Sequence, residues 1–498
     1  MPRTRRLLND EITFSVAKER EVNILHQLDY HDKQTRFFSH LNSKHAWMKA
    51  VVVHHLGLRS TEVCQVAETK DWLCGSFNVS VPVTIQDWKR RQQQGHSVLL
   101  RFPLPHRVGE AGDEKIQCEA GAYAWLQANC PGVPIPQLYG FATSTGETFT
   151  HVENLPFLSR YFQHLRRRLL SWFGLPVPSC YVRHSNRTLA SFEGVTGAGY
   201  LLIEKIEEPR GTMLSNTWSL KRHDTKLRQN FFRDLSRILL SISSIPFPQI
   251  GSFVIDSKGF LRLSNRPLSI EIVDLENEQI TTDMPRHYTY STVDSYVADI
   301  LRVHDSRLRD QPNAVNNLED CAYQMSALAA IRTTSPNIFV DENWHITCLV
   351  DLEWACSRPI EMVEPPYWLT NKGVDEIDPK DYDTLRRELM SILASEETKL
   401  LSSVTSPDTD HTVPRLSEVM EEAWTRGTFW YTLALSSPTG LFRIFYEHIQ
   451  PLLSEHCSEE IGEIMPFYWV RDVGKFVARK VSDKKKYDSD LQRAFEED

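Results

Sequence analysis

Two short segments of the first third of the chain show the patterns of β-strands, and a third segment shows that of a helix. FNVSVPVTI (77–85) alternates and is rich in β-branched residues, and SVLLRF (97–102) is short and apolar. Residues 113–129 carry one apolar stripe at helical spacing: Ile116, Ala120, Tyr123 and Leu126. Because Cys130-Pro131-Gly132 ends this periodicity, the pattern predicts a helix that stops there.

The rest of the chain is predominantly helical in pattern. Residues 1–70 and 212–335 have helical spacing, apart from a predicted hairpin at 250–264, and helices dominate from residue 378 onward. Further strand signals occur in the prolyl segment VPIPQLYGFA, at 199–207, and in a second hairpin at 337–351. The order predicts an α+β chain with two lobes, a small sheet and a larger helical part.

Composition narrows the function classes. The 498 residues are 41% apolar, and 56 Lys and Arg against 65 Asp and Glu give a formal charge of −9. This acidic balance argues against a general nucleic-acid binder, which needs a dominant basic surface. Nine cysteines without a C-x-x-C pair favour reduced thiols and a cytoplasmic protein. No apolar run is long enough to predict a transmembrane segment or a signal peptide.

The second hairpin carries the most informative chemistry. An antiparallel hairpin brings its two open ends together, and those ends carry Asn337 and Asp351. Two oxygen ligands on adjacent strand ends suit a hard cation such as Mg²⁺, with phosphate oxygens completing its shell. The alternative is that both side chains only cap a turn and a loop.

A carboxylate falls on the apolar face of the predicted helix at 113–129. Glu119 lies at helical spacing between Ile116 and Tyr123, and a buried carboxylate needs a cationic partner. Arg101, in the preceding strand, is the candidate. Such a pair holds nucleotide phosphates in protein-kinase-like enzymes, normally with lysine as the cation. An ordinary structural ion pair is the alternative.

A basic amphipathic helix is predicted at 160–173, inside an apparent insertion at 151–195. It could contact an acidic membrane or a partner's groove, although a lobe surface with a solvated charged face is the more common role of such a helix. Other signature motifs fail, since the chain has no G-x-x-x-x-G-K-[ST], H-E-x-x-H or G-x-S-x-G.

Taken in chain order, these segments resemble the fungal aminoglycoside-phosphotransferase-like family of protein-kinase-like proteins. The resemblance rests on VLLRFPLP, KIQCEAGAYAWLQANCPGVPIPQLYGF, GYLLIEKIE and NIFVDENWHITCLVDLEW. It implies a kinase-like fold with an N-lobe sheet, a C-helix and a large helical C-lobe, and binding of ATP or GTP with Mg²⁺. The residues it assigns are Gly75 in the nucleotide-covering loop, Arg101 and Glu119 as the phosphate-binding pair, Glu204 to Ile206 for adenine, and Asn337 and Asp351 for Mg²⁺.

The catalytic aspartate of that family is missing. The family pattern D-L-H-x-x-N places it five residues before the metal asparagine, where this chain has Arg332. No Asp or Glu lies between Asp320 and Asp341, and a predicted helix at 321–334 runs almost directly into the hairpin. Two explanations stay open: a real deletion, or a coding sequence that lost a segment. Without this aspartate, Mg²⁺ and phosphate binding can survive while transfer is crippled.

These inferences define the expected organisation and function. The predicted divisions are a helical extension at 1–70, an N-lobe at 71–209, a C-lobe at 210–400 and a helical region at 401–498. The resemblance implies ATP- or GTP-dependent phosphoryl transfer to a small-molecule hydroxyl, and the alternative is an inactive pseudokinase that binds nucleotide or a protein partner. Because the catalytic aspartate is missing, we expect binding of nucleotide with Mg²⁺ to be weak or absent, and no efficient transfer.

Overall fold

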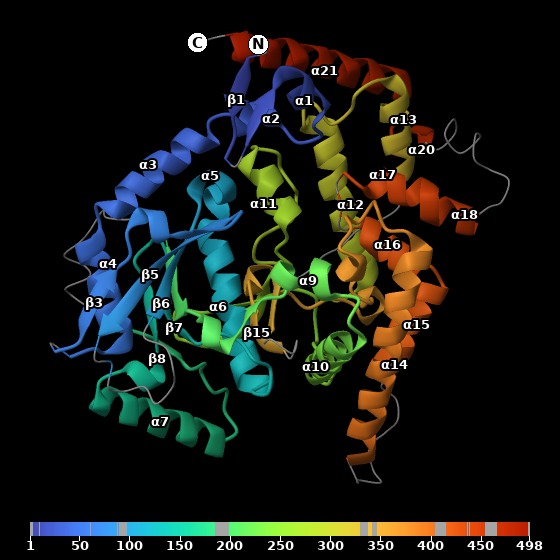
Figure 1. Cartoon of the computed structure of the whole chain (residues 1–498). Helices are drawn as coiled ribbons and strands as arrows, with labels where there is room; N and C mark the ends of the chain where they lie inside the picture. The colour runs from blue at the N-terminus through green and yellow to red at the C-terminus, as the bar shows by residue number, and fades with distance from the viewer. Residues whose placement is uncertain are drawn as a thin grey trace.

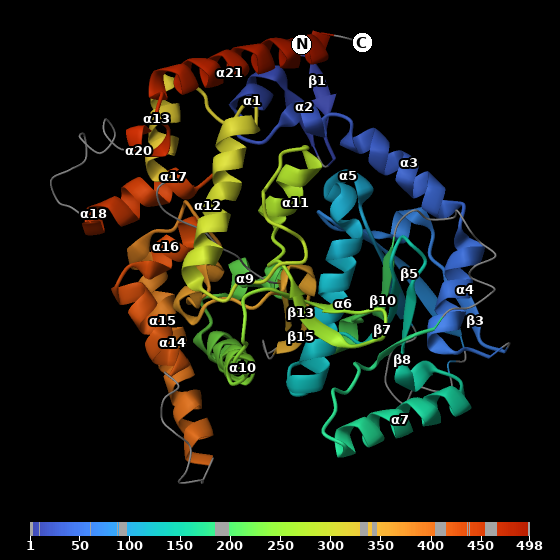
Figure 2. The same ribbon diagram turned by 180° about the vertical axis from the view of Figure 1, so that it is seen from behind.

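A computed structural model of the chain shows a mixed α+β protein, with the main sheet on one side and most of the helices on the other (Figures 1 and 2). The structure describes residues 3–8, 10–59, 61–86, 88, 97–184, 199–328, 337–340, 346–435 except 404–414, 437, 439–453 and 466–496. The α+β composition expected from the sequence is therefore confirmed.

The main sheet is antiparallel and, in the part of the chain that the structure describes, has eight strands. Its order is β3-β5-β6-β10-β7-β8-β9, and β4 pairs with β5. The strands are β3 (Val63–Val66), β4 (Leu73–Cys74), β5 (Asn78–Gln86), β6 (Ser97–Pro103), β7 (Leu138–Ala142), β8 (Thr148–His151), β9 (Tyr181–Arg183) and β10 (Tyr200–Glu204). The predicted strands at 77–85 and 97–102 are thus confirmed as β5 and β6.

Helices cover both faces of this sheet because its strands are apolar on both. On β10, Leu202 belongs to the core shared with α4 (His45–Leu56), whereas Leu201 belongs to the core shared with α6 (Gly112–Asn129). This alternation is the two-residue period of a strand. The predicted helix at 113–129 is confirmed as α6, which lies between the sheet and the helical side (Figure 1).

The helical side also contains two small β elements. Strands β12 (Ser252–Ile255) and β13 (Leu261–Asn265) form the first predicted hairpin, and β11 (Thr212–Met213), β14 (Asn337–Val340) and β15 (Ile346–Val350) form a three-stranded sheet that contains the second. The helices are α9 (Ser215–Lys221), α10 (Thr225–Ser243), α11 (Ile270–Asn277), α12 (Val293–Asp310), α13 (Leu318–Ala327), α14 (Pro379–Ser403), α15 (Leu416–Thr425), α16 (Thr428–Ala434), α17 (Leu441–Ile444), α18 (Gln450–Leu453), α20 (Pro466–Trp469) and α21 (Val473–Glu496).

Several shorter helical elements connect these parts. The α-helices are α3 (Tyr30–Asn42), α5 (Pro105–Val108) and α7 (Phe157–Trp172), and a π-helical turn spans Phe445–Ile449. The 3₁₀ turns are η1 (Thr69–Asp71), η2 (Gly109–Ala111), η3 (Val152–Asn154), η4 (Glu208–Arg210), η5 (Leu352–Trp354), η6 (Ile360–Met362) and η7 (Tyr367–Thr370). The helix expected at 321–334 begins earlier and ends at Ala327, and residues 329–336 lie outside the described part.

The two ends of the chain pack together (Figure 1). Strands β1 (Thr4–Arg6) and β2 (Glu11–Thr13) and helices α1 (Phe14–Glu19) and α2 (Ile24–Gln27) lie beside α21, where Ile12 and Ile24 share an apolar cluster with Leu491. The mostly helical pattern of residues 1–70 therefore also contains strands, and β3 joins the main sheet. The division into domains stays a prediction.

Candidate functional site

The predicted pair between Arg101 and Glu119 is present at the junction of sheet and helix. Arg101 lies on β6, a central strand of the main sheet, and its Nη1 donates to Oε1 of Glu119 on α6 at 2.9 Å. Both side chains are buried. A strand that carries the cation and a helix that carries the carboxylate are thus locked together at this point of the core.

The same guanidinium reaches the segment after the second hairpin. Its Nη2 donates to Oδ1 of Asp351 and to Oε2 of Glu353, each at 2.6 Å. Asp351 follows β15 directly and has a left-handed backbone, with φ 60° and ψ 55°. A non-glycine residue adopts this conformation at a cost in free energy, which its surroundings must offset. Its side chain is 37% exposed, so Asp351 forms the solvent-facing edge of the site.

Two further polar residues complete this site, and sequence reasoning did not assign them. Lys115, on α6, donates from Nζ to Oδ1 of Asn78 at 2.6 Å and to Oε2 of Glu353 at 2.7 Å. Asn78, at the start of β5, donates from Nδ2 to the same Glu353 oxygen at 2.5 Å. We call these six residues the Arg101 cluster: Asn78, Arg101, Lys115, Glu119, Asp351 and Glu353.

A sequence signal existed for part of this arrangement. Lys115 precedes Glu119 by four residues, so both lie on one face of the same helix. Glu353 follows Asp351 by two residues, within the D-x-E-W segment. Neither spacing shows that Asn78, Arg101 and Lys115 all donate to one oxygen of Glu353. Asn78 and Glu353, for example, are 275 residues apart in the sequence.

Burial and ion pairing set the protonation of the cluster. Burial raises the pKa of Glu119 to about 7, although Arg101 and Lys115 lower it in part. Burial also acts to raise the pKa of Glu353, but Lys115 and Arg101 outweigh this effect, and the pKa is lowered. With every group ionised, the two cations against three carboxylates leave the cluster with 2 − 3 = −1 charge.

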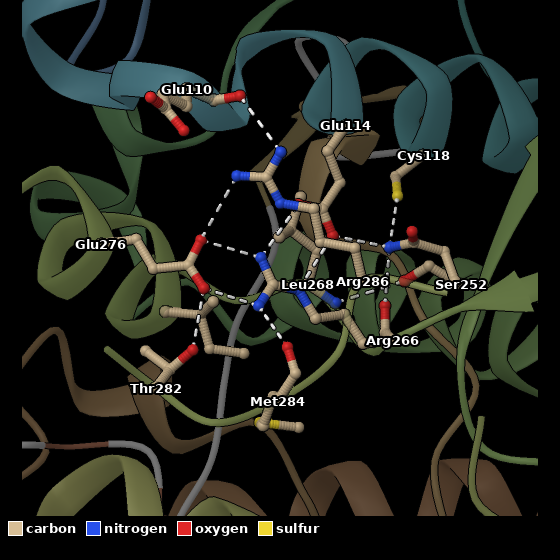
Figure 3. Close-up of polar contacts among 12 residues, drawn as sticks. Glu110, Glu114, Cys118, Ser252, Arg266, Leu268, Glu276, Thr282, Met284 and Arg286 are labelled. Carbon is tan, nitrogen blue, oxygen red and sulfur yellow. Dashed lines mark hydrogen bonds and ion pairs between the residues drawn. The ribbon is translucent and has the colours of Figure 1, made fainter. Parts of the chain in front are cut away.

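A second buried ion network holds α6 in place (Figure 3). Arg266, directly after β13, donates from Nε and Nη2 to the two carboxylate oxygens of Glu114 on α6, each at 2.9 Å. Its Nη1 and Nη2 donate to Glu276 on α11 at 2.6 and 2.9 Å, and Nη1 also donates to the Met284 carbonyl at 2.8 Å. All five guanidinium donors are therefore used. This fixes the start of α6 against the helical side, one residue before Lys115 and five residues before Glu119.

The other predicted site residues lie in the described elements around the cluster. Gly75 lies in the turn between β4 and β5, where its N–H donates to the Asn78 carbonyl at 2.9 Å. An added Cβ at Gly75 would meet only that carbonyl, at 3.7 Å, so the turn leaves room for a larger residue. Glu204 ends β10 and pairs with Arg210 at 3.0 Å, and Ile206 follows in the connecting segment.

The predicted metal pair is described in part. The backbone of Asn337 on β14 pairs with that of Val350 on β15, so residue 337 is adjacent to the start of the Asp351 segment. The side chain of Asn337 lies outside the described atoms. Among the described residues, no group of three His, Cys, Asp or Glu side chains could hold a metal ion. The carboxylate of Asp351 is a hard oxygen ligand of the kind that Mg²⁺ takes together with substrate phosphates.

The cluster also contains an unsatisfied group that could accept a further partner. Oε2 of Glu119 is buried and has no hydrogen-bond partner, whereas Oε1 is held by Arg101. A buried carboxylate oxygen without a donor is costly, and burial of that kind accounts for the raised pKa of Glu119. When every group is ionised, the net charge of −1 and the partly exposed Asp351 suit a cation at the edge of the cluster.

Comparisons with known proteins add no family to this geometry. A search against protein-family models found no model that matches the chain, and a search of curated proteins found no matching protein.

Proposed function

We propose that this chain is a phosphotransferase-like protein that binds ATP or GTP with Mg²⁺ at the Arg101 cluster. The observation that carries this proposal is the convergence of Arg101, Glu119 and Asp351, three residues that the sequence resemblance selects from distant segments. A kinase-like arrangement of a small sheet, one helix beside it and a larger helical part is proposed with it. The observed α+β architecture is compatible with that arrangement.

The proposed roles follow from the chemistry of each side chain. Asp351 supplies an oxygen ligand for Mg²⁺, and its exposed edge gives the ion access from solvent. Mg²⁺ supplies positive charge that neutralises phosphate oxygens when it is bound. Arg101 and Lys115 are the two cations of the cluster, and a planar guanidinium can contact a phosphate through two N–H groups where lysine offers a point charge.

Binding at this cluster has an electrostatic cost. Arg101 Nη2 is already held by Asp351 and Glu353, so a phosphate must displace part of an existing ion pair. We therefore expect weak nucleotide affinity, and strict dependence on Mg²⁺ because the ion releases Asp351 from its pairing with Arg101. By the same reasoning, an exchange of Asp351 for asparagine replaces the charged metal ligand by a neutral amide oxygen without emptying the site.

Efficient phosphoryl transfer is not part of the proposal for the chain as given. The sequence has no acidic residue between Asp320 and Asp341 to take the proton of an acceptor hydroxyl. A nucleotide-binding or scaffold role follows. If the expressed transcript carries extra codons in the region of residues 321–341 that restore D-L-H-x-x-N, transfer to a small-molecule hydroxyl becomes the proposed activity instead.

Thermal and chemical unfolding with nucleotide tests the binding. At ten times its Kd, a ligand that binds only the native protein stabilises it by about 1.4 kcal/mol. We expect MgATP or MgGTP to stabilise the protein, nucleotide with EDTA to have little effect, and Asp351→Asn to reduce the Mg²⁺-dependent part strongly, because the neutral amide is a weaker ligand than the carboxylate. Glu418→Gln, at a distant pair with Arg415 in which Glu418 is 65% exposed, is the matched control. No stabilisation at millimolar MgATP and MgGTP would disprove nucleotide binding.

A further inference from the structure

Helix α7 presents its apolar stripe to solvent. Its exposed apolar side chains follow helical spacing along one face, and they include Leu158, which is 79% exposed, and Trp172, which is 77% exposed. The stripe, named here the α7 stripe, consists of Leu158, Tyr161, Phe162, Leu165, Leu169 and Trp172. No residue of α7 is buried. An apolar face of this kind normally packs on the body of a protein, so its exposure needs an explanation.

The polar side of α7 faces the protein instead. Nε2 of His164 lies 2.9 Å from Oε1 of Glu153, and Nη1 of Arg160 donates to the Glu153 carbonyl at 3.4 Å. Arg167, further along the same face, donates to the carbonyl of Pro178. These contacts orient the helix. The charged face that the sequence favoured as a solvated surface is therefore partly engaged by the protein, and the apolar face is turned outward.

The charge of α7 is opposite to that of the whole chain. The helix contains four arginines and no Asp or Glu, whereas the chain carries a formal charge of −9. With about 3.6 residues per turn, Arg166 and Arg168 lie at the two edges of the α7 stripe. Long cationic side chains at the edges of an apolar face can reach phosphate groups while the face itself enters an apolar phase.

The position of α7 leaves the stripe accessible. In both ribbon views the helix lies at the outer edge of the sheet side, beside β8 and away from α10 to α21 (Figures 1 and 2). None of the helices in the described residues is long and apolar enough to cross a membrane. A 16-residue helix with an aromatic and leucine face bordered by arginines matches the pattern of helices that lie in a bilayer interface.

We infer that α7 is a peripheral membrane-binding element, which docks the protein on an anionic lipid surface through the α7 stripe and its flanking arginines. The stripe enters the boundary between headgroups and acyl chains, and Arg166 and Arg168 pair with anionic headgroups. An uncharged groove of a protein partner would cover the apolar face but would leave the arginines at both edges of the stripe unpaired, whereas anionic headgroups pair with them. The distribution of arginines therefore favours lipid.

Co-sedimentation of the full chain with extruded vesicles tests this inference. We expect binding to vesicles of phosphatidylcholine with phosphatidylserine, weak or no binding to phosphatidylcholine alone, and loss of binding at high salt. Each arginine near an anionic surface contributes about five-fold in partitioning, so Arg166→Gln with Arg168→Gln should weaken binding by about 25-fold. The triple change Leu158→Ser, Phe162→Ser and Trp172→Ser should abolish it. Because these side chains are exposed, folding should be unchanged by circular dichroism.

A matched control separates the stripe from general surface hydrophobicity. Leu220 and Leu318 are 82% and 66% exposed on other elements, and changing both to serine should leave vesicle binding unchanged. The inference is wrong if the full chain does not sediment with phosphatidylserine vesicles, or if the Leu220 and Leu318 variant loses binding as the stripe variant does. Self-association that light scattering detects only with an intact stripe, without vesicle binding, would identify a dimer interface and also overturn it. Neither result bears on nucleotide binding.

Discussion

Glu353 provides the most informative test of the Arg101 cluster. Three donors from three elements converge on its Oε2, namely Asn78 from β5, Arg101 from β6 and Lys115 from α6. Its side chain is almost fully buried, so water cannot solvate the cations that lose their partner when Glu353 becomes glutamine. The substitution keeps the shape of the side chain and removes only its charge.

The expected cost follows from the partners that remain. In Glu353→Gln, Arg101 keeps Glu119 and Asp351, whereas Lys115 keeps only Oδ1 of Asn78 among the contacts described above. Breaking one partner of a buried pair typically costs 3–5 kcal/mol. Loss of the repulsion between Glu353 and Glu119 offsets part of this. We therefore expect the free energy of unfolding to fall by about 3 kcal/mol.

A double-mutant cycle with urea unfolding, followed by tryptophan fluorescence and circular dichroism, measures this coupling. Lys115→Met alone should also cost about 3 kcal/mol, because it leaves Glu353 with one cation fewer. The double variant should cost about 2 kcal/mol less than the sum of the single changes. Glu418→Gln, which makes the same chemical change at an exposed pair, should shift stability by less than about 0.5 kcal/mol. Additive single effects, or a Glu353→Gln cost no larger than the control, would refute the buried network.

The remaining predictions concern the packing of α6 and the response to acid. A Cβ added at Gly121 would lie 2.1 Å from the Phe253 carbonyl oxygen of β12, so Gly121→Ala should destabilise the protein by about 3 kcal/mol in urea unfolding. In the same helix, a Cβ added at Gly112 would meet only a side-chain carbon at 3.5 Å, so Gly112→Ala should stabilise the protein by about 0.5 kcal/mol. Equal effects of these two variants would contradict the close crossing of α6 and β12. Burial and the neighbouring His184 lower the pKa of His54 to about 4 from its ordinary 6.5, so the unfolded chain binds the proton first and His54 reduces stability as pH falls from 6.5 towards 4. The difference in unfolding free energy between the natural protein and His54→Phe should therefore fall by about 2 kcal/mol between pH 7 and pH 5, and a pH-independent difference would show that His54 does not stay neutral in the native state.

Local patterns in the sequence determined much of this protein. Alternation specified β5 and a short apolar run specified β6, and helical spacing with a Cys130-Pro131-Gly132 stop specified α6 to within one residue of its observed start. The isolated carboxylate on the apolar face of α6 predicted a buried ion pair, and Glu119 with Arg101 confirms it. These features are predictable because each depends on residues that lie close together in the sequence: a periodic apolar face on its own segment, and the buried carboxylate on a cation in the preceding strand.

Tertiary structure alone decided how distant segments meet. That Arg101 would reach Asp351 and Glu353, 250 and 252 residues later, depends on how the second hairpin packs against α6, which no local pattern encodes. Periodicity likewise identified the apolar face of α7 but not the direction in which it points. A helical period separates an apolar from a polar face, and only the tertiary contacts show which of them packs on the rest of the protein. Here the contacts of Arg160 and His164 turn the polar face inward, so the apolar face is the one that solvent meets.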